Sequence, residues 1–271
     1  MTFRLAAQDG TLPGDCFQHR FEAAQRYGFD GIEIAVPVTG DNEDRLARIE
    51  SAVQRGVQIS SAVVASGPFI GELEPADRRR AVRHLSLLID QLGSVGVPAL
   101  VMPHSFGIAS RHLPTSGPLP PAEEARLRAA ETLGVLSERA AAAGVLVCLE
   151  PLNRYEDYAV NTLSEAAAVV EAAASPALAV VADTFHMSIE ERDISRSLRS
   201  AARFLSHIQL GDSDRLEPGH GHFDWPVFLS TLAELSYDGW LAMECGLSGP
   251  PEHVLPHVSR LLRNGARRAE P

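Results

Sequence analysis

Four polar side chains in the second half of the sequence stand at or near the ends of short apolar runs. They are Glu150 after VLVCL, Asp183 after LAVVA, Gln209 in FLSHIQL and Glu244 in GWLAMEC. A carboxylate among apolar neighbours is costly to bury unless it is paired or bound to a metal. Three carboxylates and one carboxamide oxygen form a hard oxygen site, which suits Mn²⁺ or Mg²⁺, with Co²⁺ as an alternative. We therefore expect these four residues to hold a divalent metal ion.

The spacing of the four residues indicates which elements must position them. Successive members lie about one βα unit apart, so they would come from successive parallel strands. In a closed parallel barrel the carboxyl ends of the strands meet at one face, where active sites lie. Side chains alternate along a strand, so His207 and Gln209 share one face and Met243 points away from Glu244. The alternative for each single acid is an ion pair with an arginine, and four such acids at successive strand ends favour the metal site.

Short apolar runs alternate with longer amphipathic runs along the whole chain, and this pattern predicts a single (β/α)₈ TIM barrel over residues 1–271. The predicted strands are 3–7, 31–36, 57–65, 98–103, 145–151, 178–183, 204–210 and 239–245. The predicted helices are about 14–27, 42–55, 75–95, 121–143, 163–174, 190–202, 225–236 and 251–264. An open doubly wound sheet is the alternative fold, but the first turn, AAQDGTLPGD, lacks the glycine pattern that binds dinucleotides.

Composition excludes several classes of protein. The chain has 271 residues and a net charge of -11, which disfavours a nucleic-acid partner. All 24 basic residues are arginine, so enzymes that need a lysine, such as Schiff-base aldolases and P-loop NTPases, are excluded. Three cysteines without a C-x-x-C pair, no apolar signal core and no membrane-length apolar stretch predict a cytoplasmic protein without a membrane partner.

Further polar residues lie in or near the predicted loops at the same end of the barrel. Glu156 follows strand 145–151, His186 follows Asp183, and Arg215 follows strand 204–210. A loop glutamate or arginine is by itself usually just solvated. His104 ends strand 98–103, where it caps the strand or contacts substrate, and pairing inside the barrel is at least as favoured as catalysis for Glu33 in GIEI. Residues 110–124 form a long predicted loop, which is either a lid or a plain surface loop.

Four segments together resemble a known superfamily. LEPLNRYEDYAVNT, VVADTFHMSIEE, HIQLGDSDRLEPGHGHFDW and DGWLAMECG are similar to the sugar isomerase/epimerase superfamily with the xylose-isomerase-like barrel. Within it, the likeness is closest to the ketose 3-epimerases, the tagatose/psicose epimerase group. The likeness is dense between Val145 and Gly246, and GFDGIEI is the best match before it.

The resemblance implies roles for individual residues. In such epimerases a Glu, an Asp, a His and a Glu hold Mn²⁺ or a similar ion, and three of these positions match Glu150, Asp183 and Glu244. Gln209 replaces the usual ligand histidine, as in hydroxypyruvate isomerase-like members, and can still ligate through Oε1. Three more positions match substrate-binding residues of the family, and with His104 they complete the predicted substrate contacts: Glu156, His186, Arg215 and His104.

The resulting hypothesis is a proton abstraction next to a ketose carbonyl, assisted by Mn²⁺ (or Mg²⁺ or Co²⁺). Glu150 and Glu244 would be the catalytic bases on opposite faces of the sugar. One would take the C3 proton, and the other would return a proton to the opposite face of an enediolate. The expected partners are a small-molecule sugar and further copies of the chain, because the family likeness suggests a dimer or tetramer.

Other functions remain open at this stage. Gln209 favours an isomerase of the hydroxypyruvate or 3-oxo-acid type, which would need extra arginine for the substrate carboxylate. A metal-dependent dehydratase or C–C lyase would begin with the same proton abstraction. An apurinic endonuclease on this fold would need more histidines than PGHGHFDW supplies and a chain less acidic than this one. A sugar-binding module without catalysis is disfavoured by the two opposed glutamates.

Overall fold

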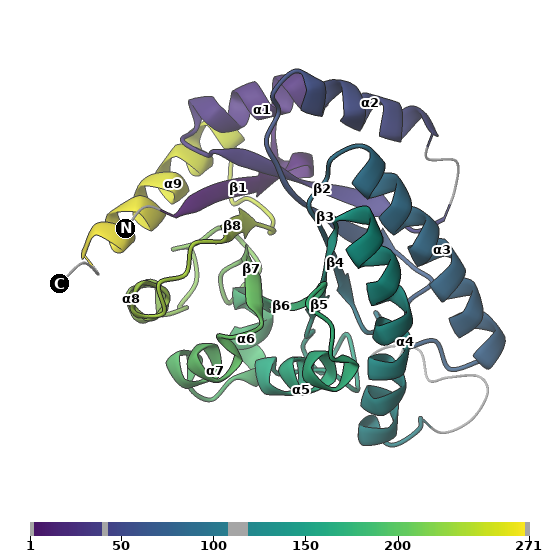
Figure 1. The fold of residues 1–271 in the computed structure, drawn as a ribbon. Helices are drawn as coiled ribbons and strands as arrows, with labels where there is room; N and C mark the ends of the chain where they lie inside the picture. The colour runs from purple at the N-terminus through teal and green to yellow at the C-terminus, as the bar shows by residue number, and fades with distance from the viewer. Residues whose placement is uncertain (1–2, 40–42, 108–118, 269–271) are drawn as a thin grey trace.

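The computed structural model describes residues 3–39, 43–107 and 119–268 and shows a closed barrel of eight parallel strands in sequence order (Figure 1). Strand β8 pairs with β1 and thereby closes the barrel. The closed barrel confirms the predicted fold, and the open doubly wound sheet is wrong. The strands are β1 Arg4–Gln8, β2 Gly31–Pro37, β3 Ile59–Ser66, β4 Ala99–Pro103, β5 Leu146–Glu150, β6 Leu178–Asp183, β7 Leu205–Leu210 and β8 Trp240–Met243.

Helices surround the barrel (Figure 1). They are α1 Phe17–Arg26, α2 Glu43–Gln54, α3 Pro75–Ser94, α4 Ala122–Ala143, α5 Leu163–Ala173, α6 Thr184–Glu190, α7 Ile194–Ala201, α8 Trp225–Glu234 and α9 Pro251–Arg268, and a 3₁₀ turn, η1, spans Asp9–Thr11. Within the described ranges, none of these helices is long and apolar enough to cross a membrane. Residues 110–118 of the predicted long loop lie outside the described residues.

One helix was not predicted. The predicted helix over 190–202 corresponds to α7, which begins at Ile194, whereas α6 lies before it and follows β6 directly. Asp183 caps α6 directly at the end of β6, because its side chain accepts a hydrogen bond from the backbone N–H of His186. Asp193 caps α7 in the same way through the N–H of Arg196. Aspartate is a favoured N-cap residue, and these two caps make two short helices out of the segment.

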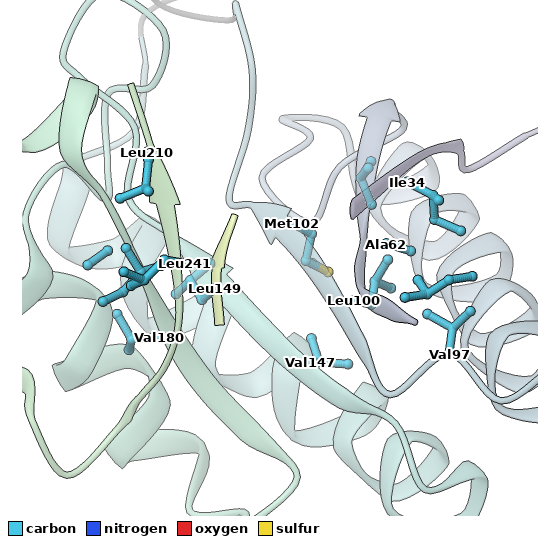
Figure 2. Close-up of a cluster of buried hydrophobic side chains, with 14 of the residues drawn as sticks. Ile34, Ala62, Val97, Leu100, Met102, Val147, Leu149, Val180, Leu210 and Leu241 are labelled. Atoms are coloured by element: carbon cyan, nitrogen blue, oxygen red, sulfur yellow. The ribbon is translucent and has the colours of Figure 1, made fainter. Parts of the chain in front are cut away.

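Alternation along the strands separates two hydrophobic clusters. One phase of each strand packs outward toward the helices, and Figure 2 shows members of this outer cluster from Ile34 on β2 to Leu241 on β8. The other phase fills the barrel interior with a smaller cluster that includes Val101, Cys148 and Val181. Full burial of each such aliphatic side chain contributes about 1.5–3 kcal/mol.

The inner phase of the strands leads directly to the predicted site. Glu150 is two residues beyond Cys148, and Asp183 is two residues beyond Val181, so both continue the inward-facing rows. On β7 the outward-facing neighbours of Gln209 are Ile208 and Leu210, which belong to the outer cluster. Because side chains alternate along a strand, these polar residues point toward the interior at the mouth of the barrel.

Candidate active site

A cavity of about 250 Å³ opens at the carboxyl end of the barrel. Its polar lining is Gln8, Glu150, Glu156, Asp183, His186, Arg215 and Glu244, and its apolar lining is Ala35, Val63, Val64, Ala65, Phe69, Pro103, Phe106 and Leu152. The volume is slightly below the range of drug-sized ligand pockets, which begins at about 300 Å³. The cavity therefore suits one small molecule, with polar groups on one side of it and an apolar wall on the other.

Asp183 joins two elements of the site. It is the last residue of β6 and the N-cap of α6, and its Oδ1 accepts the backbone N–H of His186 at 3.0 Å. This turn carries the His186 ring back over the barrel mouth. The carboxyl oxygens of Glu150 and Asp183 and a ring nitrogen of His186 lie within 4.8 Å of one another. All three side chains are buried, with exposed fractions of 5% or less.

Gln209 and Glu244 complete the predicted ligand set. The Gln209 side-chain amide donates a hydrogen bond to Glu244, and Gln8 donates another to Oε1 of Glu244 at 3.0 Å. The other end of the amide, Oε1 of Gln209, is buried and has no hydrogen-bond partner among the described residues. A buried polar atom without a partner is costly, and a carboxamide oxygen is a suitable ligand for a hard divalent cation. The donor atoms therefore fit the predicted metal.

The protonation behaviour of the carboxyls also fits a bound cation. Burial raises the pKa of Glu150 well above its ordinary value, and the nearby charges of Glu244 and Asp183 raise it further. Burial raises the pKa of Glu244 in the same direction, with added repulsion from Glu33 and Asp183. Burial raises the pKa of Asp183 to about 7. Buried acids that lie side by side resist ionisation, because each carboxylate would repel the next. A divalent cation between them removes that repulsion and favours the ionised carboxylates.

The hydrogen bonds of His186 present a donor toward the cavity. Its Nδ1 accepts the backbone N–H of Asn153 at 3.0 Å and the Asn153 side-chain amide at 2.8 Å. Burial lowers the pKa of His186 to about 3, so the ring is neutral near pH 7. A neutral imidazole that accepts at Nδ1 carries its hydrogen on Nε2. Nε2 lies 3.6 Å from Oε1 of Glu150 and 3.9 Å from Oε2 of Glu156.

Arg215 reaches the cavity from the loop between β7 and α8. Its backbone is left-handed, with φ of 61°, an uncommon conformation for a residue with a side chain. The guanidinium pairs with Glu156 and lies 4.7 Å from the ring centroid of Phe185. Asp212 organises this loop, because its carboxylate accepts five hydrogen bonds. They come from the N–H groups of Ser213, Gly219 and Phe223, from the Ser213 hydroxyl and from the Trp225 indole.

Two of the predicted site residues do not line the cavity. One is Gln209, which contacts the lining residue Glu244, and the other is His104. Its Nδ1 lies 3.1 Å from the Asp157 carboxylate, which also accepts a hydrogen bond from Ser105 at 2.7 Å. The ring packs against Gly71, where any Cβ would collide with it. His104 thus ties β4 to the loop after β5, next to Glu156, and its contact with substrate remains a prediction.

Two residues of the site were missed in the sequence. Gln8 ends the apolar run of β1 and therefore carries the same signal as Glu150, but it lies far from the dense family likeness. Asn153 binds Nδ1 of His186 through both its backbone N–H and its side-chain amide, and the sequence does not show which loop residue reaches that ring. The mouth of the cavity also has an apolar side, where Phe106 is 54% exposed.

Comparison with known proteins identifies the family. The family model described as the xylose isomerase-like TIM barrel matches residues 21–265. The chain also superposes on a crystal structure of a 3-keto-D-glucoside 4-epimerase from E. coli with a TM-score of 0.82, over 98% of both chains, at 23% identity. At that identity the superposition supports the fold alone.

Three relatives are similar along most of their length. A 3-dehydro-D-guloside 4-epimerase of Escherichia coli is 27% identical over 89% of this chain and 91% of the relative. A D-psicose 3-epimerase of Agrobacterium fabrum is 30% identical over 82% and 77%. A 2-oxo-tetronate isomerase of Cupriavidus necator is 29% identical over 90% and 94%. All three are named as epimerases or isomerases, which agrees with the predicted enzyme class.

Proposed function

The chain belongs to the xylose isomerase-like TIM barrel family, and on that premise we propose that it is a divalent-metal-dependent sugar epimerase that inverts C3 of a free ketose. The observation that carries the proposal is the pair of glutamates, Glu150 from β5 and Glu244 just after β8, which line one small cavity. Two bases on opposite faces are what inversion at a carbon requires, whereas an aldose–ketose isomerisation can use one.

Four residues would hold the metal: Glu150, Asp183, Gln209 and Glu244. The partnerless Oε1 of Gln209 and the clustered buried carboxyls support this assignment. A bound Mn²⁺, Mg²⁺ or Co²⁺ would polarise the ketone oxygen and stabilise negative charge that develops there, an effect worth several kcal/mol.

The remaining chemistry belongs to side chains of the protein. One of Glu150 and Glu244 removes the C3 proton as a general base, and the other delivers a proton to the opposite face as a general acid. His186 donates its Nε2–H to a substrate oxygen, because Asn153 holds Nδ1 as the acceptor. The Arg215 guanidinium donates hydrogen bonds to the sugar, and its ion pair with Glu156 holds it in place.

The charge of the cavity favours a neutral sugar over an oxo-acid. Among the described residues that line it, Arg215 is the one cationic side chain, and it is already paired with Glu156. Three further carboxyl groups line the same cavity, so a substrate carboxylate would meet repulsion without a free arginine. The second candidate, an oxo-acid isomerase, keeps one specific argument, since Gln209 matches the hydroxypyruvate isomerase-like pattern.

A substrate panel tests the proposal. Metal-stripped protein with added Mn²⁺ is incubated with D-fructose, D-tagatose and L-ribulose and, separately, with hydroxypyruvate and a 2-oxo-tetronate, and products are separated by chromatography. The proposal expects a C3 epimer from at least one ketose and no turnover without metal. Turnover of the oxo-acids alone would establish the second candidate, and a dehydrated product would indicate the lyase chemistry. Oligomeric state and cytoplasmic location remain predictions.

A further inference from the structure

A polar network lies beneath the cavity, and its centre is Glu33 on β2. This side chain is fully buried, with an exposed fraction of 0%. Its Oε1 accepts hydrogen bonds from Ser61 Oγ at 2.7 Å and from His207 Nε2 at 2.9 Å. Its Oε2 accepts the side-chain amide of Gln209 at 3.2 Å. A fully buried carboxyl group with three donors around it is held in one orientation.

The Gln209 amide lies between two carboxyl groups. Its Nε2 donates to Glu33 below and to Glu244 at the cavity. Carboxylates only accept hydrogen bonds, whereas a carboxamide has one donating end and one accepting end. Metal ligation requires Glu244 to be ionised, and reversing the amide would then bring its oxygen against the carboxylates of Glu33 and Glu244, which is repulsive. The two acidic neighbours therefore determine that the NH₂ end of the Gln209 amide points toward them.

The consequence concerns the opposite end of the amide. With Nε2 held by Glu33 and Glu244, Oε1 of Gln209 is turned away from both, and it is buried without a partner in the described part of the chain. A cation can bind a carboxamide through its oxygen but not through its NH₂ group. A rotated Gln209 would present NH₂ to the metal and repel it.

We infer that Glu33 is a positioning residue that orients Gln209 so that Oε1 faces the metal. The inference rests on the proposed function, because it requires that Gln209 be a ligand. Outer-shell partners of metal ligands typically change metal affinity by about 10–100-fold when they are replaced. Glu33 acts on the cation through Gln209, and Ser61 and His207 hold Glu33 for that task.

A double-mutant cycle on metal affinity tests this inference. The Mn²⁺ dissociation constant is measured by titration calorimetry on metal-stripped wild type, Glu33→Gln, Gln209→Leu and the double variant. We expect Glu33→Gln to weaken Mn²⁺ binding about 10–100-fold in the wild-type background. In the Gln209→Leu background, Glu33→Gln should raise the Mn²⁺ dissociation constant by less than about 3-fold, because the amide that Glu33 orients is gone. Equal losses in both backgrounds would mean that Glu33 acts by its charge alone and would overturn the inference.

Two further variants keep the test decisive. Ser61→Ala removes a donor to Glu33 Oε1 and leaves the contact of Oε2 with Gln209, so it is the matched control and should change Mn²⁺ affinity less than Glu33→Gln. If Glu33→Gln does not fold, Glu33→Asp keeps the charge and withdraws the carboxyl from Gln209, and it should weaken Mn²⁺ binding too.

The outcomes separate this inference from the proposed function. Wild type that binds Mn²⁺ together with unchanged affinity in Glu33→Gln would overturn the positioning role and leave the epimerase proposal intact. Wild type that binds none of Mn²⁺, Mg²⁺ or Co²⁺ would overturn the metal site and the positioning role with it.

Discussion

Glu150 and Glu244 are the same residue type in different surroundings. Glu244 accepts hydrogen bonds from Gln8 and Gln209, whereas the near neighbour of Glu150 is the ring of His186, 3.6 Å away. Burial raises the pKa of both, so each can carry or release a proton near neutral pH once a cation offsets part of the shift.

Removal of either proton carrier should stop epimerisation. Glu150→Gln and Glu244→Gln keep the size of the side chain and cannot exchange protons, so we expect kcat to fall at least about 10³-fold in each. Circular dichroism should show a folded barrel in both. Retention of activity in either variant would contradict the scheme with two glutamates.

His186 should affect turnover but not metal binding. His186→Ala removes the Nε2–H donor, and we expect kcat/KM to fall about 10²-fold, while the Mn²⁺ dissociation constant changes less than about 3-fold. The reason is that Nδ1 accepts from Asn153, which leaves no lone pair on Nε2 for a cation. A large loss of Mn²⁺ affinity would show instead that His186 is a ligand with Glu150 and Asp183.

The sequence predicts a site residue where a polar side chain ends an apolar strand. Glu150 and Asp183 carry that signal, and the structure places both at the cavity. Glu33 carries a weaker form of it, because a glutamate in mid-strand is equally compatible with a structural pair. The tautomer of His186 depends on a backbone N–H from a distant loop, and the residues around His186 in the sequence do not predict that contact.

Among the elements, the loop between β7 and α8 positions Arg215, and its geometry depends on Asp212. Asp212→Ala removes five hydrogen bonds at once. We expect KM for the ketose to rise about 10-fold or more, because Arg215 loses its left-handed position, and the melting temperature to fall. Mn²⁺ affinity should stay within about 3-fold, since the loop carries no ligand. Unchanged KM would show that Arg215 is placed without this loop.

Asp214→Ala is a matched control for that loop. Asp214 lies in the same segment and pairs with His220 on the surface, where ion pairs contribute little. We expect KM in this variant to stay close to that of wild type.

At the same scale, the eight strands and most helices follow from periodicity alone. Parallel strands that are covered by helices read as continuous apolar runs, and glycines mark several helix exits. Helix α6 did not follow, because TFHMSIE begins a helix immediately after β6 with no loop between them. Asp183 is at once the end of the strand, the helix cap and a candidate metal ligand. No turn residues therefore separate β6 from α6 in the sequence.

At the scale of the whole molecule, the buried acids should couple stability to pH and metal. The pKa of Asp183 is raised by burial from 3.8 to about 7, so this group stabilises the metal-free fold below about pH 4, and that contribution is lost as the pH rises through about 7. We expect the melting temperature of metal-free protein to fall over this window. In Asp183→Asn the fall should be smaller, and an equal slope would contradict this assignment.

Added metal should reverse that loss. At neutral pH, a cation at about 100 times its dissociation constant stabilises the folded state by about 2.7 kcal/mol. For a chain of this size that corresponds to a rise in melting temperature of roughly 5 °C. Calorimetry in two buffers of different ionisation enthalpy should also show protons released on Mn²⁺ binding, because the carboxyls must ionise to ligate.

The central claim is that one of Glu150 and Glu244 removes the C3 proton of a ketose and the other returns a proton to the opposite face, with a divalent cation that would polarise the ketone oxygen. The most direct measurement follows C3 by NMR in D₂O, with metal-stripped protein, added Mn²⁺ and D-fructose, D-tagatose or L-ribulose. We predict deuterium at C3 together with the new epimer, only when Mn²⁺ is present, and no exchange in Glu150→Gln or Glu244→Gln. Exchange at C1 without inversion at C3 would contradict the claim and indicate an aldose–ketose isomerase.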